Sequence, residues 1–195
     1  TVRGGTLRLS TRQQEGGKHL PIDRFLTSLA SDQMSSAVGI ILSGTGSDGT
    51  AGLEAIKAGG GITFAQDPRS AQHSGMPESA IDSECADFIL SPVEIARELV
   101  ELARSPHAAR AISITAPEPA NEGAEDLQEI LQMLRGASTI DFCLYKVDTI
   151  RRRVARRMAL HKIENLTRYA FYLQQNPTEV QALCQDVLIH VTSFF

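Results

Sequence analysis

Residues 37–49, AVGIILSGTGSDG, decide the fold of the first half of this chain. The segment opens with an uninterrupted apolar run, residues 37–42, which predicts a strand buried on both faces of a sheet. Three glycines in residues 43–49 then predict a sharp turn. An amphipathic segment follows and stops at three consecutive glycines, residues 59–61, which predicts a helix with a glycine C-cap.

Strands and helices alternate on both sides of this segment. A helix is predicted to open at Pro21, and two more strands are predicted at residues 61–65 and 87–90. The sequence SPVE at 91–94 is a capping box with proline at the first helical position, so a last helix begins there. This alternation implies parallel strands. We therefore predict that residues 1–104 are α/β, the C-terminal part of a doubly wound parallel-sheet domain with further strands upstream.

The second half of the chain has a different composition. Thirteen of the fifteen glycines lie before residue 76. Residues 105–123 contain three prolines and many small residues without periodicity, which predicts an exposed linker. Apolar residues then recur at helical spacing, beginning with Leu127, Ile130 and Leu134. We predict that residues 124–195 form a small all-α helical domain.

Composition excludes several classes of protein. The chain has 195 residues, of which 42% are hydrophobic, as expected for one ordinary domain or two small ones. It contains no apolar run of the roughly 20 residues that span a bilayer and no signal peptide, so we expect a cytoplasmic protein without membrane insertion. Its three cysteines lie far apart, so neither a disulfide nor a metal site is predicted. Because it begins without Met, we expect a piece of a longer polypeptide.

The glycine loop at residues 43–49 has three chemical interpretations. Its backbone N–H groups could cradle a phosphate, but it matches neither phosphate-binding glycine motif and Asp48 would repel an anion. Asp48 could be the orienting carboxylate of a Ser-His-Asp triad, because catalytic groups gather beyond the carboxyl ends of strands. Spacing alone favours an N-cap aspartate in a tight turn. Since the chain has no G-x-S-x-G elbow, a triad would need its serine and histidine upstream.

Five ordered motifs in the first half resemble the catalytic domain of the chemotaxis protein-glutamate methylesterases, the CheB-type enzymes. The motifs are LPIDRFLTSLA (20–30), AVGIILSGTGSDGTAGL (37–53), GGITFAQDP (60–68), GMPESAI (75–81) and DFILSP (87–92). The resemblance implies a cofactor-free hydrolysis of glutamyl methyl esters on chemoreceptors by a Ser-His-Asp triad. It places the triad aspartate at Asp48, with the serine and histidine upstream. It also implies a cleft-lining loop at residues 75–77, where Pro77 equally suits a helix start.

Residues 148–162 concentrate basic charge, with five arginines and Lys162 against one acid. A solvated helix face is the usual explanation of such a run. A nucleic acid partner is disfavoured by the net charge of −4 and by the absence of aromatics among the arginines. An acidic protein surface is favoured, because arginine binds carboxylates bidentately. The predicted contact residues are Arg151, Arg152, Arg153, Arg156 and Arg157.

Residues 126–195 resemble the N-terminal helical domain of the chemoreceptor glutamate methyltransferases, the CheR-type enzymes. The matching segments are FCLYK (142–146), TIRRRVARRMALH (149–161), YAFYLQQNPTEV (169–180) and LIHVTSFF (188–195). The resemblance implies that the basic helix docks on cytoplasmic helices of a chemoreceptor. It also implies contacts of Thr192 and His190 with S-adenosylmethionine in the longer polypeptide.

Together the two resemblances imply a junction fragment of a bifunctional bacterial chemotaxis protein that removes and adds methyl groups on receptor glutamates. The fragment alone is expected to be inactive. The alternative is a non-catalytic signalling scaffold, in which a degenerate esterase domain accompanies a basic helix that docks acidic helices. A serine elbow and a histidine upstream would favour the enzyme.

Overall fold

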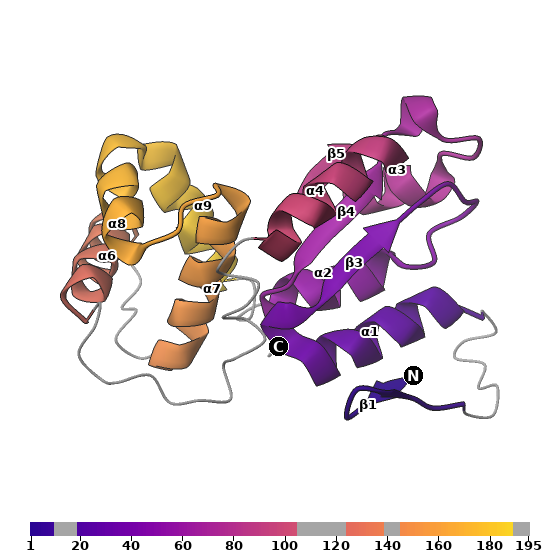
Figure 1. The fold of residues 1–195 in the computed structure, drawn as a ribbon, viewed down its shortest axis with the longest axis horizontal. Helices are drawn as coiled ribbons and strands as arrows, with labels where there is room; N and C mark the ends of the chain where they lie inside the picture. The colour runs from indigo at the N-terminus through magenta and orange to yellow at the C-terminus, as the bar shows by residue number, and fades with distance from the viewer. Residues whose placement is uncertain (10–18, 105–123, 139–144, 189–195) are drawn as a thin grey trace. The chain divides into compact units, whose positions relative to one another are not determined.

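The chain divides into two compact units, Thr1–Glu101 and Leu102–Phe195. The computed structural model describes residues 1–9, 19–104, 124–138 and 145–188 (Figure 1). The linker predicted at residues 105–123 lies outside the described residues. The division falls near the boundary predicted after residue 104.

A three-stranded parallel sheet organises the first unit. Its strands are β3 (Val38–Ile41), β4 (Ile62–Gln66) and β5 (Phe88–Leu90), hydrogen-bonded in that order. Helix α2 (Thr50–Gly59) connects β3 to β4, and α3 (Gly75–Asp82) lies between β4 and β5 in the chain. The predicted α/β class with parallel strands is confirmed.

The two faces of the sheet are covered differently. On one face Ile41 of β3 belongs to a core cluster with Leu53 and Ile56 of α2. On the other, Phe64 stacks on Phe88 with ring centroids 5.0 Å apart, and α4 (Pro92–Arg104) lies over this face (Figure 1). The prediction that β3 is buried on both faces is wrong, because Val38 is 37% exposed. Among the described residues, β3 has a neighbouring strand, β4, on one side only.

Helix α1 (Pro21–Gln33) packs on α2 through Leu26 and Ala30 and opens at the predicted proline. A short 3-10 turn, Met34–Ser36, leads from α1 into β3. The sequence did not predict the small hairpin of β1 (Val2–Arg3) and β2 (Thr6–Leu7), whose turn donates backbone N–H groups to the Asp32 carboxylate.

The capping box predicted at the start of α4 is confirmed. The Ser91 hydroxyl donates to Glu94 Oε2 at 2.6 Å, and the Ser91 N–H donates to the same oxygen at 2.9 Å. Another short 3-10 turn, Pro68–Ser70, follows β4, with the Asp67 side chain capping its first turn.

The regular elements in the described part of the second unit are all helices, as predicted. It contains α6 (Ala124–Ala137), α7 (Val147–Leu160), α8 (Leu166–Gln175) and α9 (Pro177–Leu188). Asn165 caps α8, its Oδ1 accepting the Arg168 N–H at 2.7 Å. The buried apolar residues of this unit form one cluster, listed here: Leu127, Ile130, Leu134, Ile150, Val154, Met158, Tyr169, Ala170, Leu173, Val180, Leu183, Cys184 and Val187.

Among the helices that the structure describes, none is both long and apolar enough to cross a membrane.

Candidate functional site

The loop between β3 and α2 requires glycine at two positions. Gly46 and Gly49 have φ values of 84° and 106°, which are strained for residues that carry a side chain. A Cβ at Gly49 would also collide with the side chain of Ile41. The loop therefore holds Asp48 at a defined point immediately before α2.

The half-buried Asp48 carboxylate faces the start of α1. Its Oδ1 accepts the Asp23 N–H at 2.9 Å, and its Oδ2 accepts the Ile22 N–H at 3.2 Å. The first N–H groups of a helix have no partner inside it, and the N-cap residue Leu20 forms no side-chain bond. Asp48 thus caps a helix distant in sequence.

This arrangement corrects one interpretation of Asp48 and leaves another open. Asp48 is not the N-cap of the helix that follows it, because Gly49 occupies that position. Each carboxylate oxygen accepts one backbone N–H and has a second lone pair. A histidine ring N–H could therefore still bind Asp48, as a triad requires.

Asp23 is a further residue of this site, and no sequence motif singled it out; its carboxylate binds the start of α2 in turn. Its Oδ1 accepts the N–H groups of Gly49 and Gly52, each at 2.9 Å. These donors belong to the N-cap and first turn of α2. The only available sequence signal was an acid in the first turn of a helix opened by proline, and that pattern does not identify a partner on another helix.

The other end of the loop is anchored to the segment before α3. Gly44 N–H donates to the carbonyl of His73 at 2.9 Å, and the Gly44 carbonyl accepts the Met76 N–H at 2.9 Å. The segment 75–77, predicted either to line a cleft or to start a helix at Pro77, begins α3 two residues earlier, at Gly75. Its contact with the glycine loop is direct.

Histidine does not reach Asp48 within the described residues. The side chains of His19 and His73 are exposed, and His161 belongs to the second unit. Within the described part of the chain, the hydrogen bonds of Asp48 come from the backbone N–H groups of Ile22 and Asp23. Within the same residues, no cluster of His, Cys, Asp or Glu side chains could hold a metal ion.

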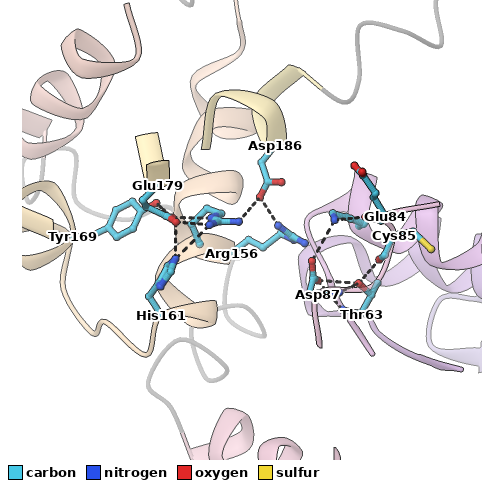
Figure 2. A network of polar contacts seen from close by, with 11 residues as sticks. Thr63, Glu84, Cys85, Asp87, Arg156, His161, Tyr169, Glu179 and Asp186 are labelled. Atoms are coloured by element: carbon cyan, nitrogen blue, oxygen red, sulfur yellow. Dashed lines mark hydrogen bonds and ion pairs between the residues drawn. The ribbon is translucent and has the colours of Figure 1, made fainter. Parts of the chain in front are cut away.

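Cys85 is structural rather than nucleophilic. Burial, helped by the charge of Glu54, raises the pKa of its thiol to about 11, so it is protonated at neutral pH. The Cys85 thiol donates to the Ala80 carbonyl at 3.1 Å. The Cys85 carbonyl accepts the Thr63 hydroxyl at 2.6 Å (Figure 2). The Thr63 N–H donates to Asp87 Oδ2 at 2.9 Å.

The arginines of α7 divide into internal and exposed members. Arg153 and Arg156 are buried, Arg152 and Arg157 are half-buried, and Arg151 is exposed. Arg156 forms an ion pair with Asp186 of α9 (Figure 2). Burial lowers the pKa of Arg153 to about 10, against the opposing charge of Asp186.

Arg157 binds Glu179 of α9 with two nitrogens. Its Nε donates to Glu179 Oε1 at 2.8 Å, and a terminal nitrogen donates to Oε2. Glu179 Oε1 also accepts the Tyr169 hydroxyl at 2.9 Å, and His161 Nε2 lies 2.7 Å from Oε2 (Figure 2). Burial by itself would lower the pKa of Arg157. The hydrogen bond to Glu179 and the negative charge of Glu179 have the larger effect, and the pKa of Arg157 is raised.

Three of the five arginines predicted to contact a partner are therefore buried or paired inside the second unit. Arg156 and Arg157 are committed to the internal carboxylates Asp186 and Glu179, and Arg153 is 2% exposed. The acids of α9 pair with Arg156 and Arg157, and the charge of Asp186 also acts on Arg153. Arg151 is exposed and Arg152 is half-buried. Thr192 and His190 lie outside the described residues.

Comparison with protein families gives two matches. Residues 2–99 match the model of the CheB methylesterases, and residues 125–188 match that of the CheR methyltransferase all-alpha domain. These matches confirm the two resemblances drawn from the motifs.

Individual relatives share different portions of the chain. A protein of Rhodobacter capsulatus, described as an uncharacterized 104.1 kDa protein in the hypE 3' region, is 37% identical over 213 aligned positions, covering 100% of this chain and 22% of the relative. Protein-glutamate methylesterase/protein-glutamine glutaminase 1 of Geobacter sulfurreducens is 38% identical over 95 residues, 48% of this chain and 26% of the relative. The chain thus spans about a quarter of these curated relatives.

One similar solved structure is the Thermotoga maritima CheB methylesterase catalytic domain. It is 36% identical, with a TM-score of 0.40 over 41% of this chain and 42% of that one.

Proposed function

Because the chain belongs to the CheB methylesterase family through residues 2–99 and continues into a CheR all-alpha domain, we propose that it is part of a bifunctional chemotaxis protein. The esterase half would hydrolyse glutamyl methyl esters on the cytoplasmic helices of chemoreceptors. The methyltransferase half would methylate the same class of glutamates with S-adenosylmethionine. Both activities belong to the longer cytoplasmic polypeptide, and this segment alone would be inactive.

The placement of Asp48 supports the esterase activity. In a Ser-His-Asp triad the aspartate accepts a histidine ring N–H, fixes the tautomer and stabilises the imidazolium that forms when histidine deprotonates serine. Asp48 lies beyond the carboxyl end of β3 in a loop held by glycine geometry, with lone pairs remaining on both oxygens. The serine and histidine would come from chain upstream of this segment.

The basic helix supports a docking role for the second unit. Arg151 is exposed and Arg152 half-buried on α7, so their guanidinium groups would bind acidic side chains on a receptor helix. The S-adenosylmethionine site would involve Thr192 and His190 together with chain downstream. We expect no nucleic acid partner and no membrane insertion.

One observation favours the scaffold alternative. Asp48 already has a structural task, because it caps α1 through Ile22 and Asp23. A degenerate esterase domain would keep that contact without a catalytic histidine. Activity measurements must therefore separate the capping role from the catalytic one.

The test is the Asp48→Asn variant of the full polypeptide. We expect its methylesterase turnover to fall about 10³–10⁴-fold, because the amide would favour the wrong histidine tautomer. The assay is methanol release from a methylated receptor fragment. Asp32→Asn is the matched control, since Asp32 also caps backbone N–H groups, at the other end of α1.

Normal turnover in Asp48→Asn would remove Asp48 from the triad. Undetectable turnover in the wild-type polypeptide would favour the scaffold.

A further inference from the structure

We propose that Asp23 is a positioning residue for Asp48, and this inference rests on the proposed catalytic role of Asp48. The two carboxylates form a reciprocal pair of caps. Asp48 binds the first turn of α1, which carries Asp23, and Asp23 binds the first turn of α2, which Asp48 immediately precedes.

The hydrogen bonds of Asp23 hold the backbone that orients the Asp48 side chain. One goes to Gly49, the residue after Asp48, and the other to Gly52 in the same helical turn. Gly49 adopts a left-handed φ of 106°, so its conformation is set by its surroundings rather than by a side chain. The loss of Asp23 would release this backbone unit.

The opposite end of the loop has its own anchor. Gly44 is held by backbone bonds with His73 and Met76, which do not involve α1. Gly46, between the two anchors, has no neighbouring atom within 4 Å of a would-be Cβ and thus lies in open space. The position of Asp48 is therefore set at the α2 end of the loop, where the Asp23 side chain accepts hydrogen bonds from the start of α2.

The hydrogen bonds of Asp23 to the start of α2 would affect the methylesterase turnover as well as the stability of the fold. Triad geometry tolerates little error, since a misplacement of about 1 Å can reduce a rate by about 100-fold. A displaced Asp48 would also stabilise the imidazolium less, which lowers the pKa of the triad histidine. The acid limb of the pH–rate profile would then move to lower pH, a change that a purely structural residue would not produce.

The experiment compares variants of the full polypeptide in the methanol-release assay. We expect Asp23→Ala to lower kcat about 10–100-fold with KM nearly unchanged, and to move the acid limb down by about 0.5–1 pH unit. Asp23→Asn should retain turnover to within about threefold, because a single oxygen, Oδ1, accepts both bonds and an amide supplies it. Asp32→Ala, at the far end of α1, is the control and should match the wild type.

A second variant keeps the proposal testable if Asp23→Ala folds poorly. Asp23→Gln keeps a polar acceptor on α1 but places it one methylene further out, so it should lose turnover as Ala does. An unchanged acid limb in both Asp23→Ala and Asp23→Gln, or an Asn variant as slow as Ala, would overturn the proposal.

Parallel measurement of Asp48→Asn separates the two claims. If Asp48→Asn is slow while the Asp23 variants are normal, only the positioning role fails. If Asp48→Asn is itself normal, the proposed catalytic role fails and the positioning role with it.

Discussion

Glu179 connects three helices through side chains of different chemistry. It binds Arg157 of α7 and Tyr169 of α8, and His161 at the end of α7 lies beside it. Its own exposure is 5%. A buried carboxylate is tolerated when its charge and lone pairs are matched, and here a guanidinium and a phenol supply the partners. The network makes the packing of α7 on α9 specific.

We predict that Glu179→Gln lowers the free energy of unfolding of the helical unit by about 3 kcal/mol, because Arg157 loses its main countercharge. All three tyrosines, Tyr145, Tyr169 and Tyr172, lie in the second unit, and the chain has no tryptophan. Urea unfolding followed by near-UV circular dichroism of tyrosine therefore reports this unit. The exposed Glu164, changed to Gln, is the control and should cost under about 0.5 kcal/mol.

The same carboxylate predicts a pH dependence. Burial alone would raise the pKa of Glu179, but Arg157 outweighs it and holds that pKa below its ordinary value of 4.5. A lowered folded-state pKa contributes stability that is present above the unfolded value and lost as pH falls through the folded value. The stability gap between wild type and Glu179→Gln should therefore narrow below about pH 4.5. A gap that stays constant from pH 7 to pH 3 would contradict this assignment.

At the level of elements, α1 and α2 approach closely because α2 carries Gly52. A Cβ there would lie 2.5 Å from Leu26 Cβ and 3.3 Å from Asp23 Cα, and neither atom can rotate away. Gly59 in the same helix differs, since its nearest neighbour, the Ala30 carbonyl oxygen, would be 3.5 Å away. Helix propensity favours alanine over glycine at both sites by about 1 kcal/mol.

We predict opposite effects of two alanine substitutions in α2. Gly52→Ala should destabilise the first unit by about 1–3 kcal/mol, because the overpacking cost exceeds the gain in propensity. Gly59→Ala should be neutral or stabilising by up to about 1 kcal/mol. Far-UV circular dichroism during urea unfolding measures both. Equal effects of the two variants would mean that the α1–α2 contact can relax.

For the whole molecule, the proposed function brings two opposing chemistries to one receptor. Each methyl ester removed restores a negative charge on a receptor helix, and each one added neutralises a charge. A surface that carries Arg151 and Arg152 would bind the acidic, unmethylated form more strongly, because the attraction scales with the charge of the partner. Docking through these residues would thus favour the substrate of methylation over its product.

We predict that Arg151→Ala with Arg152→Ala weakens binding of the full polypeptide to an unmethylated receptor fragment about tenfold and flattens its salt dependence. Titration calorimetry at two ionic strengths measures both quantities. Arg168→Ala removes an exposed arginine from α8 and is the control for nonspecific charge. Equal weakening by Arg168→Ala would show that net charge, rather than α7, directs the binding.

Most of the helices and strands could be predicted from the sequence, because their signals are local. The apolar run before Ser43 and the SPVE capping box each depend on residues within a few positions of one another, and both predicted elements are present. The motif order also identified both families. Asp48 stood out for the same local reason, its place among the glycines.

The side-chain partners of Asp48, Asp23 and the arginines of α7 depend on tertiary packing and could not be predicted from the sequence. The caps made by Asp48 and Asp23 join residues 25 to 29 positions apart in the sequence. Arg156 and Arg157 pair with acids on α9 rather than facing solvent. Helical periodicity specifies which face of a helix a residue occupies, but not the charge on the helix that packs against that face. Burial penalises an unpaired charge, so the acids of α9 determine which arginines are internal.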